Sequence, residues 1–371
     1  MTFTEDFNFE DIVKKAINKA QKERGQVNIL IAGKTGVGKS TLINAVFQGN
    51  LATTGQGEPV TQETREIKKE GIPLSIFDTR GLEMASYSQT LENLKSLVTD
   101  RAQRSDSNQH IHVAWVCIME DSRRVEQADK ELVKMLKDRN IPIIAVITKI
   151  RSKKSDQGFR NEVIRLLPDV KNAVRVRALE EEDDEGKVYP TLGLDVLVDL
   201  TMQVVPEELK RAFIAAQKVD IKLKITKSHA IVVASAASAA GIAATPIPFS
   251  DAVAIVPIQV VMLASISATF GLSVDKSFLT TVVGSIIAGA GGTLAGRAIV
   301  ASLLKLIPGA GSVAGGAIAA GTAIALTTTL GETYIKVLEM LFNENNGEQP
   351  TQTEVADAFR KECSQLAIIK K

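Results

Sequence analysis

The sequence is poor in cysteine, with only Cys117 and Cys363 among its 371 residues. So few cysteines exclude a disulfide framework and are typical of a protein from a reducing compartment. The net charge is only +1, so overall charge does not predict a nucleic-acid partner. The stretch Met1–Asp6 is acidic and has no apolar core, so we expect no signal peptide.

Charge is scarce in one part of the chain. Between Ala230 and Gly331 the sequence carries few charged residues, unlike a typical soluble domain. Aromatic residues make up only 4% of the chain, while glycine and alanine crowd this half. The length allows two domains, and the shift in composition predicts that they differ in kind. The charged residues of this stretch are Asp251, Asp275, Lys276, Arg297 and Lys305.

One complete motif stands in the first half. Residues Gly33–Ser40 read G-K-T-G-V-G-K-S and match the phosphate-loop pattern G-x-x-x-x-G-K-[ST]. The apolar run Val27–Ala32 before it predicts a buried strand, and Thr41–Phe47 after it predicts a helix. In that context the backbone N–H groups of the loop would point at phosphate oxygens. Lys39 would reach the outer phosphates and the Ser40 hydroxyl would bind Mg²⁺, so we predict a nucleotide-binding protein.

Two further stretches suit a nucleotide switch. The polar loop Gly49–Glu66 offers Thr61, or failing that Thr64, as a ligand to Mg²⁺ and the last phosphate, unless it is an ordinary solvated loop. The apolar run before Asp78 predicts a strand beside the phosphate loop. Asp78 would hold Mg²⁺ through a water molecule, and Gly81, which ends D-T-R-G, would offer its N–H to the last phosphate.

Apolar strands alternate with helical patterns up to residue 178. This alternation predicts the fold class α/β, a doubly wound, mostly parallel sheet with helices on both faces. The acidic run Glu180–Glu185 is expected to be a solvated loop and not a metal site. The predicted elements are strands at 112–119, 141–147 and 173–178, with a helix at 125–140.

The first 200 residues resemble the Era-like, translation-factor-related P-loop GTPases. The motifs already described follow the order of that family, and Thr148-Lys149 matches the start of its guanine-reading T/N-K-x-D motif. Arg177-Ala178-Leu179 stands where such domains carry S-A-K. The resemblance implies GTP or GDP as ligand, with Mg²⁺. It assigns nucleotide binding to Gly33, Lys34, Thr35, Gly36, Val37, Gly38, Lys39, Ser40, Thr41, Asp78, Gly81, Thr148, Lys149 and Ala178, catalysis to Lys39, Thr61 and Gly81, and metal binding to Ser40, Thr61 and Asp78.

The sequence departs from the family at two positions. Arg151 replaces the aspartate whose carboxylate accepts the guanine N–H groups, so guanine selectivity is weakened unless Asp156 substitutes. Leu82 stands where several GTPases place a glutamine that orients water, so hydrolysis should be slow without a partner or self-association. Arg80 could act on phosphate charge or be a plain surface residue.

The second half predicts an apolar helical domain. A helix is expected from Pro206, and its basic residues would face anionic lipid at the cytoplasmic side of a membrane. Small residues recur every fourth position from Gly284 to Gly296, a spacing that lets membrane helices pack closely. A soluble bundle of buried helices remains the alternative. The basic residues are Lys210, Arg211, Lys218, Lys222, Lys224 and Lys227, and the apolar segments are 230–247, 252–272, 278–296 and 298–330.

This half also resembles the YcjF-type bacterial domain of unknown function, on Pro246–Asp251, Gln259–Leu263 and Leu306–Gly311. We therefore predict a bacterial, membrane-associated GTPase switch that hydrolyses GTP slowly, with no nucleic-acid partner. The alternatives are a dynamin-like or interferon-inducible-like scaffold that self-assembles into oligomers, a soluble cytoplasmic GTPase with a partner-docking domain, and an ATP-binding or mixed-specificity protein. The expected domains are an amphipathic helix (1–25) packed on the nucleotide domain, a GTPase domain (26–205), the apolar domain (206–342), and a linker with a final helix (343–371).

Overall fold

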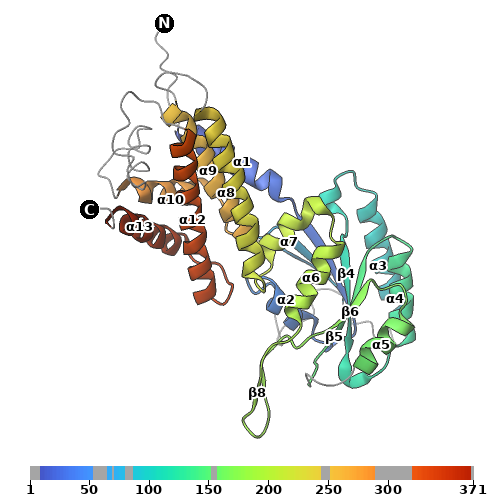
Figure 1. The fold of residues 1–371 in the computed structure, drawn as a ribbon. Coiled ribbons are helices and arrows are strands. Elements are labelled where there is room, and N and C mark those ends of the chain that lie inside the picture. Colours follow the sequence, from blue (N-terminus) through green and yellow to red (C-terminus); the bar gives the residue numbers. More distant parts are fainter. Residues whose placement is uncertain are drawn as a thin grey trace. The chain divides into compact units, whose positions relative to one another are not determined.

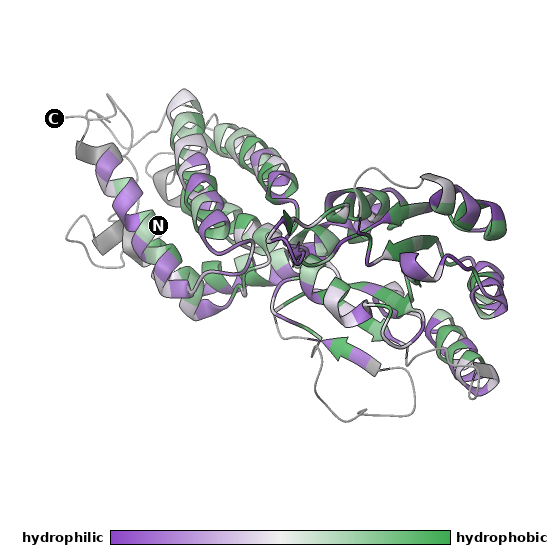
Figure 2. Ribbon diagram, turned by 90° about the horizontal axis from the view of Figure 1, so that it is seen from below, coloured by the Kyte–Doolittle hydropathy of each residue, from purple (hydrophilic) through white to green (hydrophobic). Residues whose placement is uncertain are grey.

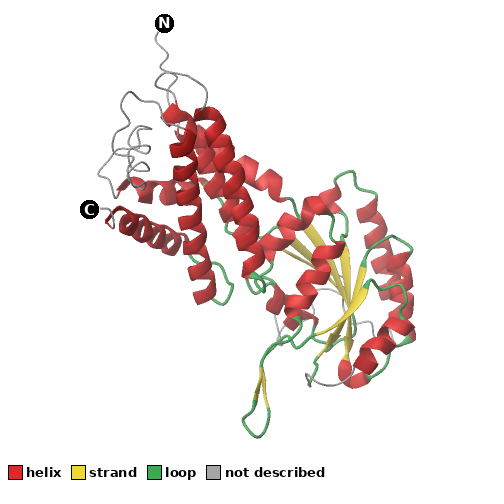
Figure 3. Ribbon diagram, in the orientation of Figure 1, coloured by secondary structure: helices red, strands yellow, loops and turns green. Residues whose placement is uncertain are grey.

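The computed structural model describes residues 9–52, 65–68, 71–79, 87–151, 157–243, 251–288 and 320–368. The chain divides into two compact units. One unit comprises Gly25–Asp220 and contains the strands, which Figure 3 draws in yellow. The other combines Met1–Arg24 with Ile221–Lys371, and its described elements are helices (Figure 1).

The first unit is built on a six-stranded sheet of order β2-β3-β1-β4-β5-β6. Every neighbouring pair is parallel except β2 with β3, so the predicted doubly wound α/β fold is confirmed. All residues of β1 and β5 are buried, as expected for parallel strands covered on both faces. The strands are β1 (Val27–Ala32), β2 (Arg65–Lys68), β3 (Leu74–Asp78), β4 (Val113–Met119), β5 (Ile143–Thr148) and β6 (Asn172–Arg175).

Helices cover both faces of this sheet. On one face, Leu94 of α3, Leu132 of α4 and Val163 of α5 pack into a single core with residues of β1, β4 and β5. On the other face, Trp115 of β4 stacks on Phe47, with 5.6 Å between ring centroids, and donates to Thr201 of α6. The helices are α2 (Lys39–Val46), α3 (Tyr87–Ala102), α4 (Gln127–Lys137), α5 (Gln157–Leu166), α6 (Leu194–Val204) and α7 (Lys210–Ala216).

The acidic run forms a hairpin of β7 (Glu181–Glu182) and β8 (Val188–Tyr189). Asp183 orders the turn, because its carboxylate accepts hydrogen bonds from the backbone N–H groups of Glu185 and Lys187 and from the Tyr189 hydroxyl. The acidic side chains are largely solvated, as the sequence predicts, but the backbone is paired.

The helix expected from Pro206 is interrupted. A 3-10 turn at Glu207–Leu209 leads into α7, which ends before Gln217, and α8 (Ile221–Ala243) starts four residues later. The Gln217 side chain accepts from Asp220 N and donates to Asp220 O. These bonds satisfy backbone groups at the break, which the apolar pattern did not indicate.

The second unit is a helical bundle with one shared core. Helix α12 packs against α8, α9 and α13, while α1 packs against α9 and α10. The expectation that the N-terminal helix packs on the nucleotide domain is wrong, because Val13, Ala16 and Ala20 are buried in this bundle's core. An amphipathic pattern defines a buried face without naming the partner. The helices are α1 (Phe9–Arg24), α8 (Ile221–Ala243), α9 (Asp251–Phe270), α10 (Lys276–Ala288), α12 (Ala320–Glu344) and α13 (Gln352–Ile368).

Small and polar side chains shape the interior of this bundle. A Cβ on Gly331 would approach Val232 to 2.5 Å, so glycine lets α8 and α12 pack closely. The Tyr334 hydroxyl lies 2.7 Å from Ser267 Oγ, between α12 and α9. Lys224 is fully buried and donates to Phe270 O, so this member of the predicted basic belt does not face solvent.

Within the described residues, one helix is long and apolar enough to cross a membrane. This is α8, and 22% of its apolar window is buried. A shorter apolar stretch, Ile255–Phe270, belongs to α9. Figure 2 shows hydrophobic (green) and hydrophilic (purple) residues mixed along the helices. The segments predicted at 278–296 and 298–330 lie partly outside the described residues.

Candidate functional site

The phosphate loop joins the end of β1 to the start of α2, as the sequence predicts. Gly33, Gly36 and Gly38 have φ values of +151°, +73° and +99°, which glycine adopts more readily than other residues. A Cβ on Gly33 would also come within 2.5 Å of the Cys117 carbonyl oxygen. The loop therefore depends on glycine for its backbone path and for its fit against β4.

Lys39 opens α2 and curls back over this loop. Its ammonium donates to the carbonyl oxygens of Gly33 (2.8 Å) and Lys34 (3.0 Å). Burial lowers the pKa of Lys39, while the nearby Asp78 carboxylate acts in the opposite direction. A cation held by exchangeable carbonyl partners in a glycine loop is suited to bind phosphate oxygens.

Asp78 and Ser40 are the described members of the predicted metal site. Asp78 ends β3 and pairs in register with Ile31 of β1, so its strand end lies beside the strand that leads into the phosphate loop. Ser40 is half-buried in the first turn of α2. Hydroxyl and carboxylate oxygens are ligands that Mg²⁺ accepts, with phosphate and water completing its shell. Among the described residues there is no cluster of three or more His, Cys, Asp or Glu side chains that could hold a metal, and this kind of site needs none.

The predicted base-binding residues lie at the ends of β5 and β6. The Thr148 hydroxyl donates to Val37 O at 2.7 Å, which ties the end of β5 to the phosphate loop. Lys149 has a left-handed backbone, with φ of +56°, and its Cε lies 3.9 Å from a Cβ built on Gly38. Ala178 is half-buried just beyond β6. The parallel sheet therefore brings Thr148 and Lys149 to the phosphate loop.

Arg151 has a partner that the sequence analysis missed. Its exposed guanidinium lies 3.1 Å from the Asp121 carboxylate, on the turn after β4. Glu120, the residue before Asp121, is buried and pairs with Arg175 of β6 at 2.6 Å. A carboxylate thus stands beside position 151, although not at it. No local sequence signal links Asp121 with Arg151, because they follow two different strands, β4 and β5.

Lys34 of the phosphate loop also has an unpredicted partner, Glu126. Glu126 is the N-cap of α4 and forms a capping box with Asp129. Burial raises the pKa of Asp129. Glutamate is not a preferred N-cap residue, so the local sequence signalled neither this cap nor its contact with the phosphate loop.

Several predicted site residues lie outside the described residues. They include two assigned to catalysis, Thr61 and Gly81, and the positions that bear on hydrolysis and selectivity. For these residues the sequence expectations stand as predictions. Besides Thr61 and Gly81, the predicted residues outside the described part are Thr64, Arg80, Leu82 and Asp156.

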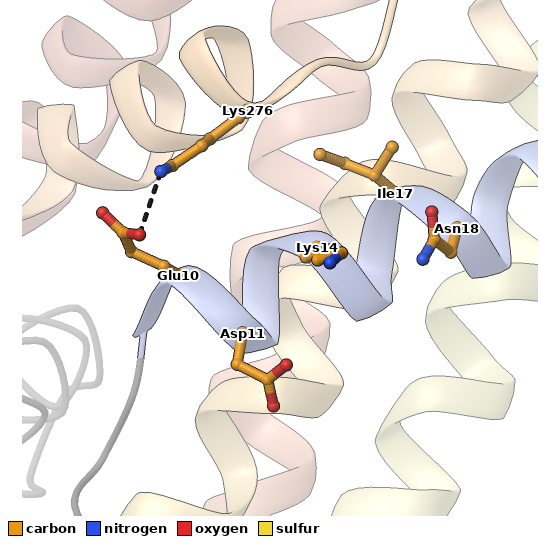
Figure 4. Close-up of a pocket in the computed structure, with 6 residues that line it drawn as sticks. All are labelled: Glu10, Asp11, Lys14, Ile17, Asn18 and Lys276. Carbon is orange, nitrogen blue, oxygen red and sulfur yellow. Dashed lines mark ion pairs between the residues drawn. The ribbon is translucent and has the colours of Figure 1, made fainter.

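A surface pocket of about 320 Å³ lies in the helical unit, between α1 and α10 (Figure 4). Its edge carries an exposed ion pair between Glu10 and Lys276 at 3.0 Å. The lining mixes charged and polar side chains with the apolar Ile17, and none of its residues was predicted to act. The remaining lining residues are Asp11, Lys14, Ile17 and Asn18.

Comparison with protein families finds two matches along the chain. Residues 28–149 match the family described as 50S ribosome-binding GTPase, and residues 211–364 match a domain of unknown function, DUF697. The predicted fusion of a GTPase domain with a YcjF-type domain is thereby confirmed.

Curated relatives match parts of the chain. Mouse (Mus musculus) Septin-14 is 28% identical over 211 residues, which is 51% of this chain and 48% of the relative. GTPase Der of Campylobacter concisus is 30% identical over 132 residues, 35% of this chain and 26% of the relative. The chain therefore spans between a quarter and a half of the length of these relatives.

Solved structures also resemble part of the chain. A point variant of Aquifex aeolicus Era bound to GDP·AlF4⁻ is 20% identical with a TM-score of 0.35, over 58% of this chain and 68% of that one. Toc33 from Arabidopsis thaliana with GDP and Mg²⁺ is 19% identical with a TM-score of 0.34, over 57% and 95%.

Proposed function

We propose that this chain, which joins a GTPase domain to a DUF697 domain, is a GTP-binding switch whose helical unit associates with a membrane. The observation that carries the proposal is the phosphate loop with its curled Lys39. Lys39 would bind phosphate charge, and Ser40, Thr61 and Asp78 would hold Mg²⁺, which supplies further positive charge to the phosphates when bound. The backbone N–H groups of the loop and of Gly81 supply further donors to the phosphates.

Slow hydrolysis is part of the proposal. Leucine has no hydrogen-bonding group in its side chain, so Leu82 gives the attacking water no orientation. Turnover then stays low unless another protein or another copy of this chain completes the site. Guanine selectivity is reduced as well, because an arginine at position 151 cannot accept the guanine N–H groups.

Contacts within the sheet unit support transmission of the nucleotide state to the segment after α7. Gln48, just beyond α2, is fully buried and donates to Ala215 O (3.1 Å) and Gln217 O (3.3 Å). Lys218 N donates to Val46 O, the last residue of α2. The helix that follows the phosphate loop is therefore bonded at its far end to the segment that continues into α8. Switch proteins couple phosphate contacts to packed elements of this kind.

Exposed apolar side chains on two helices of the helical unit support membrane association. Val233 of α8 is 69% exposed and Ile324 of α12 is 43% exposed, although both helices pack together. Around Val233, the solvent-facing residues of α8 are small, apart from His229, which pairs with Glu332 of α12. Exposed apolar side chains on neighbouring helices favour a lipid surface as partner. The small residues are Ala230, Ala234, Ala237 and Gly241.

Sedimentation with vesicles of mixed neutral and anionic lipids tests this proposal. Full-length chain should sediment with the vesicles, and V233D combined with I324D should remain in the supernatant. The matched control is V188D combined with V196D, which places the same two charges at exposed valines of the sheet unit and should sediment normally. Equal sedimentation of all three proteins would contradict a lipid role for this face.

The same exposed face also favours the rival function, a scaffold that self-assembles. Measuring GTP turnover over a range of protein concentrations separates the two. A turnover rate per molecule that rises with concentration indicates self-assembly, while a constant slow rate indicates a simple switch.

A further inference from the structure

Arg177 is a buried arginine directly beside the predicted base-binding loop. It lies just beyond the end of β6, and only 3% of the residue is exposed. The guanidinium donates to three backbone carbonyl oxygens: Ile150 (3.0 Å), Arg151 (2.7 Å) and Pro190 (3.0 Å). Only arginine offers several donors in a rigid planar fork that can span such a set.

Two of these carbonyls belong to the loop that follows Thr148 and Lys149. The hydroxyl of Thr148 already bonds this loop to the phosphate loop at one end. Arg177 bonds it at the other end, at residues 150 and 151. The Arg151 side chain is directed to Asp121, so Arg177 contacts the backbone of position 151 and not its side chain.

Arg177 is itself held firmly by the end of the hairpin and by the segment that follows it. Its backbone exchanges two hydrogen bonds with Leu192, at 2.9 and 3.0 Å. Its guanidinium carbon lies 5.3 Å from the centre of the Tyr189 ring. Gly193 packs directly against the end of β6, because a Cβ there would meet Arg175 O at 2.1 Å. The arginine therefore has a fixed anchor from which to position the loop.

We propose that Arg177 is a positioning residue that holds the loop 148–151 in shape to bind the purine base, in a chain that lacks a carboxylate at position 151. The inference rests on the proposed nucleotide function and adds to it the residue that sets base affinity. Phosphate affinity comes from Lys39 and the glycine loop, whereas the guanidinium of Arg177 bonds residues 150, 151 and 190. Loss of Arg177 should therefore weaken binding of the base and spare binding of the phosphates.

The test compares GTP with inorganic tripolyphosphate, a ligand that has phosphates and no base. Both are titrated with Mg²⁺ into full-length wild type, R177M and R177K by calorimetry. R177M should bind GTP about tenfold more weakly, because two charge-assisted hydrogen bonds to the loop are lost, and tripolyphosphate within about twofold of wild type. R177K keeps the charge but has one donor head, so we expect an intermediate loss of about threefold for GTP.

The matched control is R160M. Arg160 of α5 also donates to backbone, at Ala173 O (2.7 Å), and to the side chain of Asn172, both of which belong to β6 and not to the loop 148–151. R160M should leave both affinities within about twofold of wild type. Should R177M lose its native circular dichroism, R177K carries the comparison.

Different results would overturn the role of Arg177 and the proposed function. Equal losses for GTP and tripolyphosphate would show a general structural role for Arg177 and overturn the inference, as would unchanged GTP affinity in both variants. A wild-type chain that binds neither ligand would overturn the proposed function, and the inference with it. A selective loss for GTP supports both.

Discussion

Glycine has a different role in each of the two compact units. In the sheet unit, Gly33, Gly36 and Gly38 have positive φ and give the phosphate loop its path. In the helical unit, Gly331 lies inside α12, where its missing side chain leaves room for Val232. One unit uses glycine for backbone conformation and the other for close packing. Glycine content alone therefore does not distinguish a binding loop from a helix contact.

Buried lysines show the same contrast. Lys39 bonds the carbonyl oxygens of a loop that can exchange them for a ligand. Lys224 bonds Phe270 O at 3.2 Å and lies 6.0 Å from the ring centre of Phe342, inside a helical core. Burial of a cation marks a candidate site only when its partners belong to an element that can bind something else.

The largest expected effect concerns the two buried lysines, which should differ in their contribution to GTP binding. K39M should weaken binding of Mg²⁺–GTP by at least about 100-fold, because a charge-assisted contact to phosphate is lost in a buried site. K224M, which removes the other buried ammonium, should leave GTP affinity within about twofold. Calorimetric titration of both variants measures this. Similar losses in both would mean that the two lysines do not differ in role.

Two glycine-to-alanine variants of α12 test whether Gly331 is needed for close helix packing. G331A should lower the free energy of unfolding by about 1–3 kcal/mol, because the new Cβ would lie 2.5 Å from a branched Val232 side chain. G321A, near the start of the same helix with nothing within 4 Å, should not lower it, because alanine is the better helix former. Urea unfolding followed by circular dichroism gives both values. A gain in stability for G331A would contradict the close packing of α8 and α12.

A smaller effect is expected at the base-binding loop. R151D restores an acceptor at position 151 and should raise the ratio of GTP to ATP affinity by about tenfold. The change is best made with D121N, so that two carboxylates do not repel each other across the 3.1 Å contact. Competition of ATP against labelled GTP measures the ratio, with D121N alone as the control. An unchanged ratio would mean that position 151 does not read the base.

The smallest effect concerns pH and the sheet unit alone. His112 Nδ1 accepts from Asn28 N at 2.9 Å, so the imidazole is neutral when the unit is folded. Burial lowers the pKa of His112 below its ordinary value of 6.5. The unfolded chain then binds a proton more readily, so the stability of the native state falls as pH drops below 6.5. Urea unfolding at about pH 7.5 and about pH 5.5 should show this loss in wild type, and a smaller loss in H112Q.

Local patterns predicted much of the sheet unit. The buried strands β1, β4 and β5 were found because parallel strands read as apolar runs, and the glycine motif marked the loop between β1 and α2. The strand β2 was missed, since Arg65–Lys68 is short, polar and defined only by its antiparallel pairing with β3. Pairing across a sheet edge leaves little trace in the segment itself.

Contacts between residues distant in sequence were also not predicted. The contacts of Arg151 with Asp121, Lys34 with Glu126 and Arg177 with Pro190 join residues on separate loops. The motif identified position 151 as unusual, but only the folded sheet shows that Asp121 lies beside it. The placement of α1 failed for the same reason, because its apolar stripe suits either unit.

The hydrogen bond from Thr148 to Val37 has a consequence for kinetics. It joins the loop expected to contact the base to the loop expected to contact the phosphates, at 2.7 Å and away from solvent. One end of a bound nucleotide then cannot loosen without disturbing the other. Dissociation of the nucleotide should follow a single exponential, without a fast phase in which the base leaves its loop before the phosphates do.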